Sequence, residues 1–378
     1  MSSCVVIGIL PPSVDLYKCV KEKVASINDQ PIQWRENYSM VEDEENNNAL
    51  TLLMMGVYEE PLTHELVVEE VTKTLTTTKE QEQQEQQQQE HTQYSCELWA
   101  SAPAPLPLRP LEGYANKILI QEECWETQAP ATMQEYGIVQ QQTILTPDQV
   151  GEIRQIVDRA IANVDSLLAK HRPNIEIGED SFIFKEIASR NLQRFDLRLD
   201  TLPEAVEFVK RSVLGHPSVD FLLQKALGSP HEIDFDVSVV YSRPGAITQK
   251  WHADGSHQKG ANDAGWEVDG WKKNLASAYA LCLFIPLIDL DYDTGYTQFW
   301  PGSHRHKNLV GFGPAAELAK ATFDGIGAAG DGVWYDYRLL HRGMYNVSTK
   351  VRPVVQVIFK KKWYVERVNY GKESIVKS

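Results

Sequence analysis

Hydrophobic positions between residues 233 and 359 fall into short runs, several of which alternate with polar positions. Runs of this kind, separated by Gly, Pro and Asp, are typical of strands. Few helical repeats interrupt them, so we expect a mainly β domain, an antiparallel barrel or jelly roll packed against preceding helices. The runs that predict strands are Ile233–Ser242, Ala278–Ile288, Tyr296–Trp300, Gly332–Tyr337 and Arg352–Phe359.

A long amphipathic helix is predicted before these strands. Thr146 can cap its first turn, Pro147 suits the first helical position, and Gln149 completes a capping box. Apolar residues then recur at helical spacing as far as Leu168, which gives the helix one apolar face. That face begins with Val150, Ile153, Ile156, Val157, Ala160 and Ile161.

The first 78 residues predict a separate, small α/β region. Its apolar runs, with one further run after residue 95, follow the order βαββαβ, which would suit a ferredoxin-like sandwich. We find no catalytic constellation there and expect a structural or partner-binding role. The predicted strands are Val5–Leu10, Trp34–Val41, Leu50–Tyr58 and Cys96–Ala100, and the predicted helices are Val14–Ile27 and His64–Leu75.

Residues 79–124 have the composition of a linker. Lys79–Gln93 contains only Glu, Gln, Lys, His and Thr, so this segment cannot bury a core. Ala100–Pro110 has alternating prolines, which favour an extended chain. The expected organisation is therefore an α/β region at 1–78, a linker at 79–124 and a catalytic domain at 125–378.

Composition restricts the class of protein further. Hydrophobic residues make up 42% of the chain and charged residues 24%, which is typical of globular proteins. The net charge of −15 disfavours nucleic acid and anionic membranes as partners. No apolar run approaches the ~20 residues of a spanning helix, and no basic segment precedes the first apolar run, so we expect a cytoplasmic protein. The five scattered cysteines indicate neither a disulfide framework nor a zinc knuckle.

The strongest chemical signal is a candidate metal site. His252 and Asp254 are two positions apart, so in an extended segment both side chains point the same way. His341 follows the predicted strand at 332–337 and could supply a third ligand. Two neutral imidazoles and one carboxylate form the facial triad of non-haem iron(II) oxygenases, which leaves coordination positions for a 2-oxo acid and O2.

Arg352 is the candidate anchor for such a 2-oxo acid. If its strand lies beside the one that leads to His341, Arg352 faces the barrel interior together with Val354, Gln356 and Ile358. A buried arginine needs an anion, and the distal carboxylate of 2-oxoglutarate would provide one in bidentate geometry. The alternative is an arginine in a salt bridge at the barrel rim.

Three stretches resemble the phytanoyl-CoA dioxygenase family of 2-oxoglutarate oxygenases: Gln249–Asp254, Gly295–His304 and Gly330–Arg352. The resemblance covers roughly residues 125–364. It implies a double-stranded β-helix (cupin-like) fold, an iron(II) cofactor, 2-oxoglutarate and O2 as cosubstrates, and ascorbate as an auxiliary reductant. It also implies that His252, Asp254 and His341 hold the iron and that Arg352 anchors 2-oxoglutarate.

Two parts of the site remain open at this stage. Some relatives carry a hydroxyl residue two positions after the distal histidine, where this chain has Gly343. Thr297, Tyr241 or Gln249 could replace it as a second anchor. For the substrate we consider Arg198, Trp251 and His257, each of which could equally be a surface residue, as could Arg194. Gly255–Lys273, a long insertion after Asp254, could act as a lid.

The resulting expectation is a dioxygenase that hydroxylates an aliphatic C–H bond of a small molecule and releases succinate and CO2. Asp254 favours hydroxylation, because a Gly or Ala there would leave room for chloride and indicate a halogenase. Desaturation and ring formation stay open, as does a non-catalytic barrel that serves as a binding or scaffold protein. His304 is a rival ligand, but in the resembling family that histidine usually supports a loop.

Overall fold

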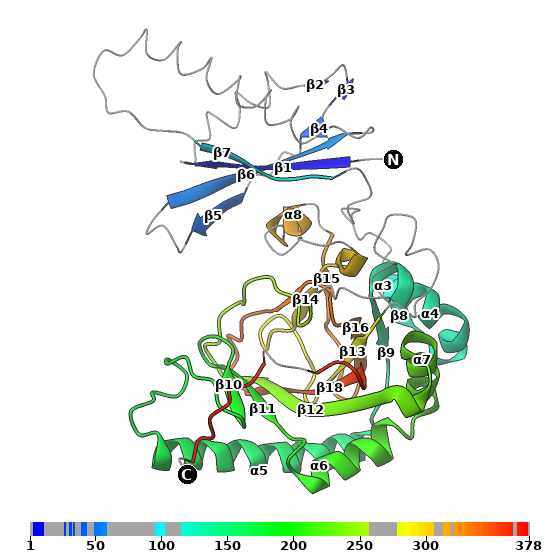
Figure 1. Cartoon of the computed structure of the whole chain (residues 1–378), viewed down its shortest axis with the longest axis vertical. Coiled ribbons are helices and arrows are strands. Elements are labelled where there is room, and N and C mark those ends of the chain that lie inside the picture. Colours follow the sequence, from blue (N-terminus) through cyan, green and yellow to red (C-terminus); the bar gives the residue numbers. More distant parts are fainter. Residues whose placement is uncertain are drawn as a thin grey trace. The chain divides into compact units, whose positions relative to one another are not determined.

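The computed structural model divides the chain into two compact units (Figure 1). Unit 1 comprises Met1–Leu111 and Asn308–Thr322, and unit 2 comprises Glu112–Lys307 and Phe323–Ser378. The structure describes residues 3–10, 26–27, 30–31, 33–34, 39–43, 49–58, 95–102, 115–256, 278–305, 313–318, 321–365 and 369–376.

Unit 1 contains an antiparallel sheet with the strand order β4-β6-β1-β7, and β5 also pairs with β6. The strand predicted at Trp34–Val41 is two short strands, both on β6, and the helix predicted at Val14–Ile27 cannot reach its end, because Ser26–Ile27 pairs with Gln30–Pro31. The rest of that helix, the helix at His64–Leu75 and the Lys79–Gln93 tract lie outside the described residues, so the ferredoxin-like fold stays a prediction. The elements are β1 Ser3–Leu10, β2 Ser26–Ile27, β3 Gln30–Pro31, β4 Gln33–Trp34, β5 Ser39–Asp43, β6 Ala49–Tyr58, β7 Ser95–Ala102 and α8 Gly313–Leu318.

Unit 2 is built on two sheets. The larger has the strand order β10-β11-β12-β18-β13-β16-β9-β8, and the smaller has the order β15-β14-β17. This arrangement is the predicted double-stranded β-helix with flanking helices. The strands are β8 Leu119–Ile120, β9 Ile138–Gln141, β10 Ile187–Ser189, β11 Arg194–Arg198, β12 Ile233–Ser242, β13 Ala280–Pro286, β14 Thr297–Phe299, β15 Phe323–Asp324, β16 Gly332–Asp336, β17 His341–Gly343 and β18 Arg352–Lys361.

Helices cover one face of the larger sheet, with α5 running past β11 and β12 in Figure 1. Helix α5 (Pro147–His171) begins with the predicted capping box of Thr146 and Gln149. Its apolar face joins alternate residues of β12 in one hydrophobic core, because successive side chains of a strand point to opposite faces. The other face of β12 is left for the barrel interior. The remaining helices are α3 Ala115–Ile118, α4 Trp125–Tyr136, α6 Pro203–Phe208 and α7 Pro217–Leu227.

Two expectations about chain organisation differ from the structure. Unit 2 begins at Glu112, before the expected residue 125, because α3 and β8 belong to it and β8 pairs with β9. Likewise, β7 lies within the segment expected to be a linker.

Strand β18 pairs with β12 and β13, so it does not lie beside β16, the strand that leads to His341. The barrel therefore places Arg352 and His341 on different sheets.

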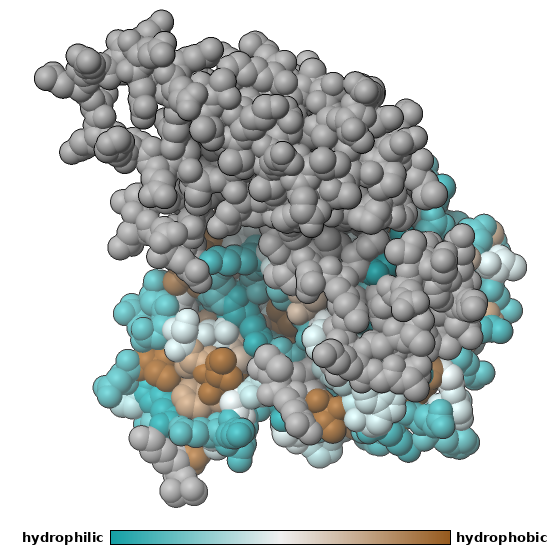
Figure 2. Space-filling model, turned by 45° about the horizontal axis from the view of Figure 1, so that its top comes forward, coloured by the Kyte–Doolittle hydropathy of each residue, from teal (hydrophilic) through white to brown (hydrophobic). Residues whose placement is uncertain are grey.

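The described surface of unit 2 is a mixture of hydrophilic and hydrophobic residues on the face shown in Figure 2. The exposed large hydrophobic side chains of unit 2 include Ile183, Val347 and Trp363. Among the described residues, no helix combines the length and apolar character that crossing a membrane requires.

Candidate active site

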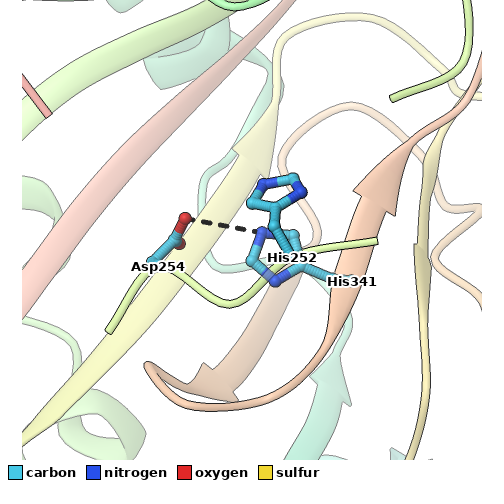
Figure 3. Close-up of side chains that lie close together, drawn as sticks. All are labelled: His252, Asp254 and His341. Carbon is cyan, nitrogen blue, oxygen red and sulfur yellow. Dashed lines mark ion pairs between the residues drawn. The ribbon is translucent and has the colours of Figure 1, made fainter. Parts of the chain in front are cut away.

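The three predicted ligands meet in the barrel. Their donor atoms, one from each of His252, Asp254 and His341, all lie within 4.8 Å of one another. The carboxylate of Asp254 points at His341 (Figure 3), with 3.6 Å between Asp254 Oδ1 and His341 Nε2. The two imidazole rings are 4.5 Å apart between centroids. The triad can therefore hold one metal ion.

Backbone contacts bring these side chains together. His252 and His341 exchange both backbone hydrogen bonds, at 3.0 and 2.8 Å, so the segment before Asp254 is fastened to β17. The amide of Gly255 then donates to the Tyr337 carbonyl at 2.8 Å. A Cβ at position 255 would collide with the side chains of Tyr279 and Tyr337, so a glycine lets the chain pass behind the site.

Both histidines are oriented for metal binding. Nδ1 of His252 bonds to the Lys250 carbonyl, and Nδ1 of His341 bonds to the Leu339 carbonyl, each at 2.9 Å. A carbonyl can only accept, so both Nδ1 atoms carry the proton and both Nε2 atoms are left with a lone pair. Burial and the neighbouring His341 lower the pKa of His252 to about 4. Neutral imidazoles of this kind are the form that binds a metal.

The third ligand is held by a tyrosine that the sequence did not single out. The hydroxyl of Tyr335, on β16, donates to Asp254 Oδ2 at 2.7 Å. This contact engages one carboxylate oxygen and leaves Oδ1 directed toward the histidines. Two neutral nitrogens and one carboxylate oxygen are the donor set of non-haem iron(II), so the residues present fit the metal that the sequence predicted.

Arg352 is buried in the barrel, with 3% of its surface exposed. Its Nη1 donates to the carbonyls of Tyr296 and Met344, at 3.3 and 3.4 Å, and no carboxylate pairs with it among the described residues. Burial, followed by the charge of Arg194, lowers its pKa well below the usual value for arginine. The alternative of a rim salt bridge is therefore wrong, and the guanidinium is available to an anion.

Comparison with known proteins identifies the family. The family model described as phytanoyl-CoA dioxygenase matches residues 133–354, which is more than half of the chain. The chain belongs to the phytanoyl-CoA dioxygenase family. Together with the His-Asp-His cluster, this membership makes the protein a non-haem iron dioxygenase that depends on 2-oxoglutarate.

Solved structures with a similar fold are more distant. The epimerase SnoN in complex with Fe3+, alpha ketoglutarate and nogalamycin RO is 16% identical, with a TM-score of 0.43 over 61% of this chain and 81% of that chain. EctD from S. alaskensis, with 2-oxoglutarate and 5-hydroxyectoine, is 15% identical, with a TM-score of 0.44 over 66% and 86% of the two chains.

Of the three candidates for a second anchor in this dioxygenase, only Thr297 keeps a suitable position. Thr297 lies opposite Gly343 in the β14–β17 pair and lines an enclosed pocket with Phe284 and Val354. Tyr241 points to the outer face, because its neighbour Ser242 is the residue that pairs with Arg352. Tyr241 therefore faces away from Arg352, which contradicts the anchor role predicted for it.

Gln249 is already engaged at both ends of its amide. Its Oε1 accepts from the Gly343 amide at 3.0 Å, and its Nε2 donates to the Arg190 carbonyl at 3.1 Å. The side chain thus links β17 to the segment before β11 by hydrogen bonds. These contacts replace the anchor role that the sequence suggested.

The three substrate candidates have different outcomes. Trp251 alternates with His252 and packs under the outward-facing Arg342, whose guanidinium carbon lies 4.8 Å from the ring centroid. It therefore lies behind the ligand segment, and its role toward the substrate stays a prediction. Arg198 forms an ion pair with Asp200 and lines a cavity described below. His257 and most of the insertion after Gly255 lie outside the described residues.

The rival ligands remain apart from the triad. His304 is buried and fills the space over Gly137, and burial lowers its pKa to about 3. Asp331 accepts from the amides of Thr143 and Ala328, at 3.0 and 2.9 Å, so it stabilises the turn before β16.

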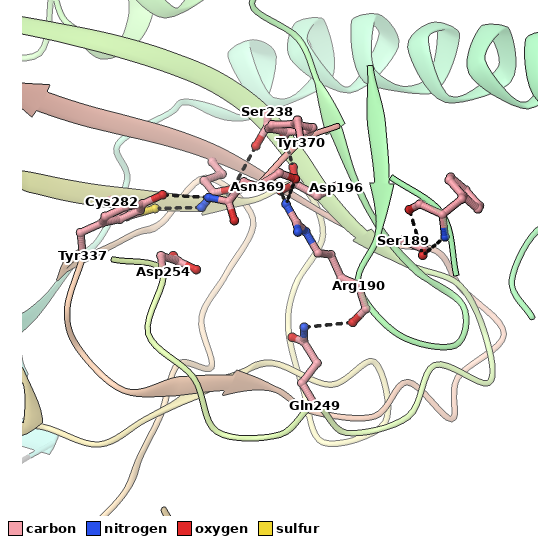
Figure 4. A network of polar contacts seen from close by, with 12 residues as sticks. Ser189, Arg190, Asp196, Ser238, Gln249, Asp254, Cys282, Tyr337, Asn369 and Tyr370 are labelled. Carbon is pink, nitrogen blue, oxygen red and sulfur yellow. Dashed lines mark hydrogen bonds and ion pairs between the residues drawn. The ribbon is translucent and has the colours of Figure 1, made fainter. Parts of the chain in front are cut away.

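A large cavity of about 510 Å³ opens beside the site and was not predicted. Gln356 forms part of its wall and donates to Cys282 Sγ at 3.4 Å, and burial together with the charge of Asp254 raises the pKa of the Cys282 thiol. Figure 4 shows Asp254 and Cys282 with the polar groups that surround the cavity. The lining residues include Asp196, Arg198, Asp200, Asp236, Ser238, Gln356, Ile358, Lys360, Asn369, Tyr370 and Lys372.

The cavity wall combines apolar side chains, among them Val237 and Val365, with polar groups that are largely paired with one another. Asp196 accepts from Arg190 Nη2 at 2.9 Å and from the Tyr370 hydroxyl at 2.6 Å. Lys360 forms an ion pair with Asp236. The sequence did not indicate this network, because its members come from β11 and the segment before it, from β12 and β18, and from the segment after residue 368.

Proposed function

We propose that this dioxygenase hydroxylates an aliphatic C–H bond of a small, polar molecule. In this proposal His252, Asp254 and His341 hold iron(II), and Arg352 binds the distal carboxylate of 2-oxoglutarate. The convergence of the three donor atoms within 4.8 Å supports the ligand assignment. The buried guanidinium of Arg352, which no carboxylate among the described residues neutralises, supports the anchor.

The cavity beside the triad is the observation that carries the substrate class. Its volume of about 510 Å³ falls within the range of pockets that hold small ligands. Carboxylates, amides and hydroxyls lie among its lining residues, so a bound molecule meets hydrogen-bonding groups on several sides. A long aliphatic chain would displace water from those groups without offering them hydrogen bonds, which costs binding free energy. Arg198 is the lining residue that we assign to substrate recognition.

Iron(II), when bound with 2-oxoglutarate and O2, supplies the oxidising power, and succinate and CO2 are released. The contribution of the protein is orientation. Tyr335 fixes the carboxylate of Asp254, and the Leu339 carbonyl fixes the ring of His341. Since Asp254 fills its ligand position, no room is left there for chloride, and the expected outcome is hydroxylation.

The test measures succinate released by the full-length, iron-loaded protein in the presence of small compounds. The panel compares polyols, amino alcohols and polar amino acids with fatty acyl thioesters. We expect at least one polar compound to raise succinate release about tenfold and to gain one oxygen atom by mass spectrometry. Asp254→Ala should abolish the stimulation, whereas His231→Ala, which changes an exposed histidine, should retain it.

Three results would contradict the proposal. Stimulation by acyl thioesters alone would overturn the polar substrate class. A product that has lost two hydrogens without gaining oxygen would replace hydroxylation by desaturation or ring formation. If the folded, metal-loaded protein consumed no 2-oxoglutarate with any compound, the non-catalytic barrel would be the better account.

A further inference from the structure

Three buried polar side chains form a row across neighbouring strands of the larger sheet. In the strand register, Arg194 on β11 lies directly opposite Ser242 on β12, and Ser242 lies directly opposite Arg352 on β18. Residues directly opposite each other on adjacent strands share one face of the sheet. Their exposed surface is 1%, 0% and 3%, respectively. The interpretation of Arg194 as a surface charge is therefore corrected.

The row is incomplete in its hydrogen bonding. Within the described part of the chain, Arg194 Nε, Ser242 Oγ and Arg352 Nε have no hydrogen-bond partner. The partners that the two guanidinium groups do have are carbonyls, and they share one: Met344 O lies 2.7 Å from Arg194 Nη2 and 3.4 Å from Arg352 Nη1. Ile247 O completes the contacts of Arg194 at 3.0 Å.

Two buried cations that share a carbonyl are electrostatically unfavourable without an anion. Burial lowers the pKa of Arg194 to about 10, and the charge of Arg194 adds to the effect of burial on Arg352. No carboxylate forms a salt bridge with either guanidinium among the described residues. An anion that enters between them would satisfy both charges and the three unpaired atoms.

Arg194 also occupies the space that a side chain at position 343 would need. Gly343 and His341 are on the same face of β17, since they are two positions apart. A Cβ at position 343 would lie within 3.0 Å of Arg194 Nη1 and of Gln249 Oε1. The guanidinium of Arg194 therefore occupies the space in which some relatives carry a hydroxyl residue.

We propose that Arg194 and Ser242 join Arg352 in binding the distal carboxylate of 2-oxoglutarate, with Arg194 replacing the hydroxyl missing at Gly343. This inference rests on the proposed function, in which Arg352 is the first anchor. Two guanidinium groups around one carboxylate leave a net positive charge. The site should therefore discriminate strongly between dicarboxylic and monocarboxylic 2-oxo acids.

The test is an anaerobic titration of the full-length, iron(II)-loaded protein, followed by visible absorption of the chelated 2-oxo acid. Two ligands are compared: 2-oxoglutarate, and 2-oxobutyrate, which lacks the distal carboxylate. Arg194→Gln should raise the Kd for 2-oxoglutarate about 10- to 100-fold, as expected for a lost hydrogen bond to a charged group. Ser242→Ala should raise it several-fold. Neither change should alter the Kd for 2-oxobutyrate.

Arg211→Gln is the matched control, because Arg211 is exposed and pairs with Glu152. It should leave both dissociation constants unchanged. A second comparison uses the space at Gly343. Gly343→Ser alone should weaken 2-oxoglutarate binding, since the new side chain meets Arg194. In an Arg194→Ala, Gln249→Ala background the same change should strengthen binding, because both side chains that crowd position 343 are then removed.

Several outcomes would overturn the inference. Wild-type affinity for 2-oxoglutarate in both Arg194→Gln and Ser242→Ala would contradict it. Equally weakened binding of 2-oxoglutarate and 2-oxobutyrate would indicate a structural role instead. Gly343→Ser having the same effect in both backgrounds would also contradict it. A wild-type protein that binds 2-oxobutyrate but not 2-oxoglutarate would refute this carboxylate site alone, whereas one that binds neither would refute the proposed function as well.

Discussion

Tyr335 links the metal centre to the wall of the barrel. Its hydroxyl is fully buried and donates to Asp254 at 2.7 Å, so it fixes which carboxylate oxygen faces the two histidines. Groups that orient a ligand in this way typically change metal affinity by about 10- to 100-fold when they are removed.

We therefore expect Tyr335→Phe to lower the affinity for Mn(II) by about 10- to 100-fold, measured by competition with a chelator. Tyr337→Phe is the control, because the Tyr337 hydroxyl accepts from Asn369 rather than touching a ligand. That variant should stay within about twofold of the wild type. Equal affinity in Tyr335→Phe and the wild type would show that the hydroxyl does not position Asp254.

Arg194 shows why part of the site was missed at the residue scale. In the sequence it is one arginine beside the apolar run of β11 and looks like a surface charge. Its burial results from Ser242, Gly343 and Met344, which come from two other segments of the chain. By contrast, His252 and Asp254 are two residues apart, so local spacing alone placed them on one face.

Helix α5 is the element whose start was predicted most fully. Thr146 accepts from the Gln149 amide, and the Gln149 side chain accepts from the Thr146 amide at 2.9 Å. Both contacts are local, which is why the sequence was sufficient to predict them. The apolar face of α5 packs on the same core as Val237 and Val239 of β12, so the helix supports the strand behind the anion site.

Thr146→Ala should therefore lower the free energy of unfolding by about 1 kcal/mol, since a capping side chain typically contributes that amount. Urea denaturation at neutral pH would measure the change. Thr201→Ala, at another exposed threonine, should have a smaller effect. An unchanged unfolding free energy in Thr146→Ala would indicate that packing, and not the cap, determines where α5 begins.

Strand positions were predictable, but strand neighbours were not. All five strands expected after residue 232 are present, because alternation and turn residues are local signals. Which strands pair depends on contacts distant in sequence. This is why β18 was expected beside the strand that leads to His341 but lies between β12 and β13. The same limitation left open which residue of β12 faces Arg352; the strand register shows that it is Ser242.

At the scale of the whole molecule, the iron and 2-oxoglutarate chemistry belongs to unit 2. The C-terminal segment contributes to the cavity, since Tyr370 bonds to Asp196 and the Glu373 carbonyl accepts from the Lys185 amide at 2.8 Å. The resemblance did not reach this segment, so its role was not foreseen. A protein partner for unit 1 and a cytoplasmic location remain predictions from the sequence.

The central claim is that His252, Asp254 and His341 hold one metal ion, and the most direct test is the stoichiometry of Mn(II) bound to the full-length, metal-free protein. Calorimetric titration should find one ion per chain in the wild type and in His231→Ala. Asp254→Ala and His341→Ala should lose that site while remaining folded by circular dichroism. A folded wild type that binds no ion, or a full site in both ligand variants, would contradict the account.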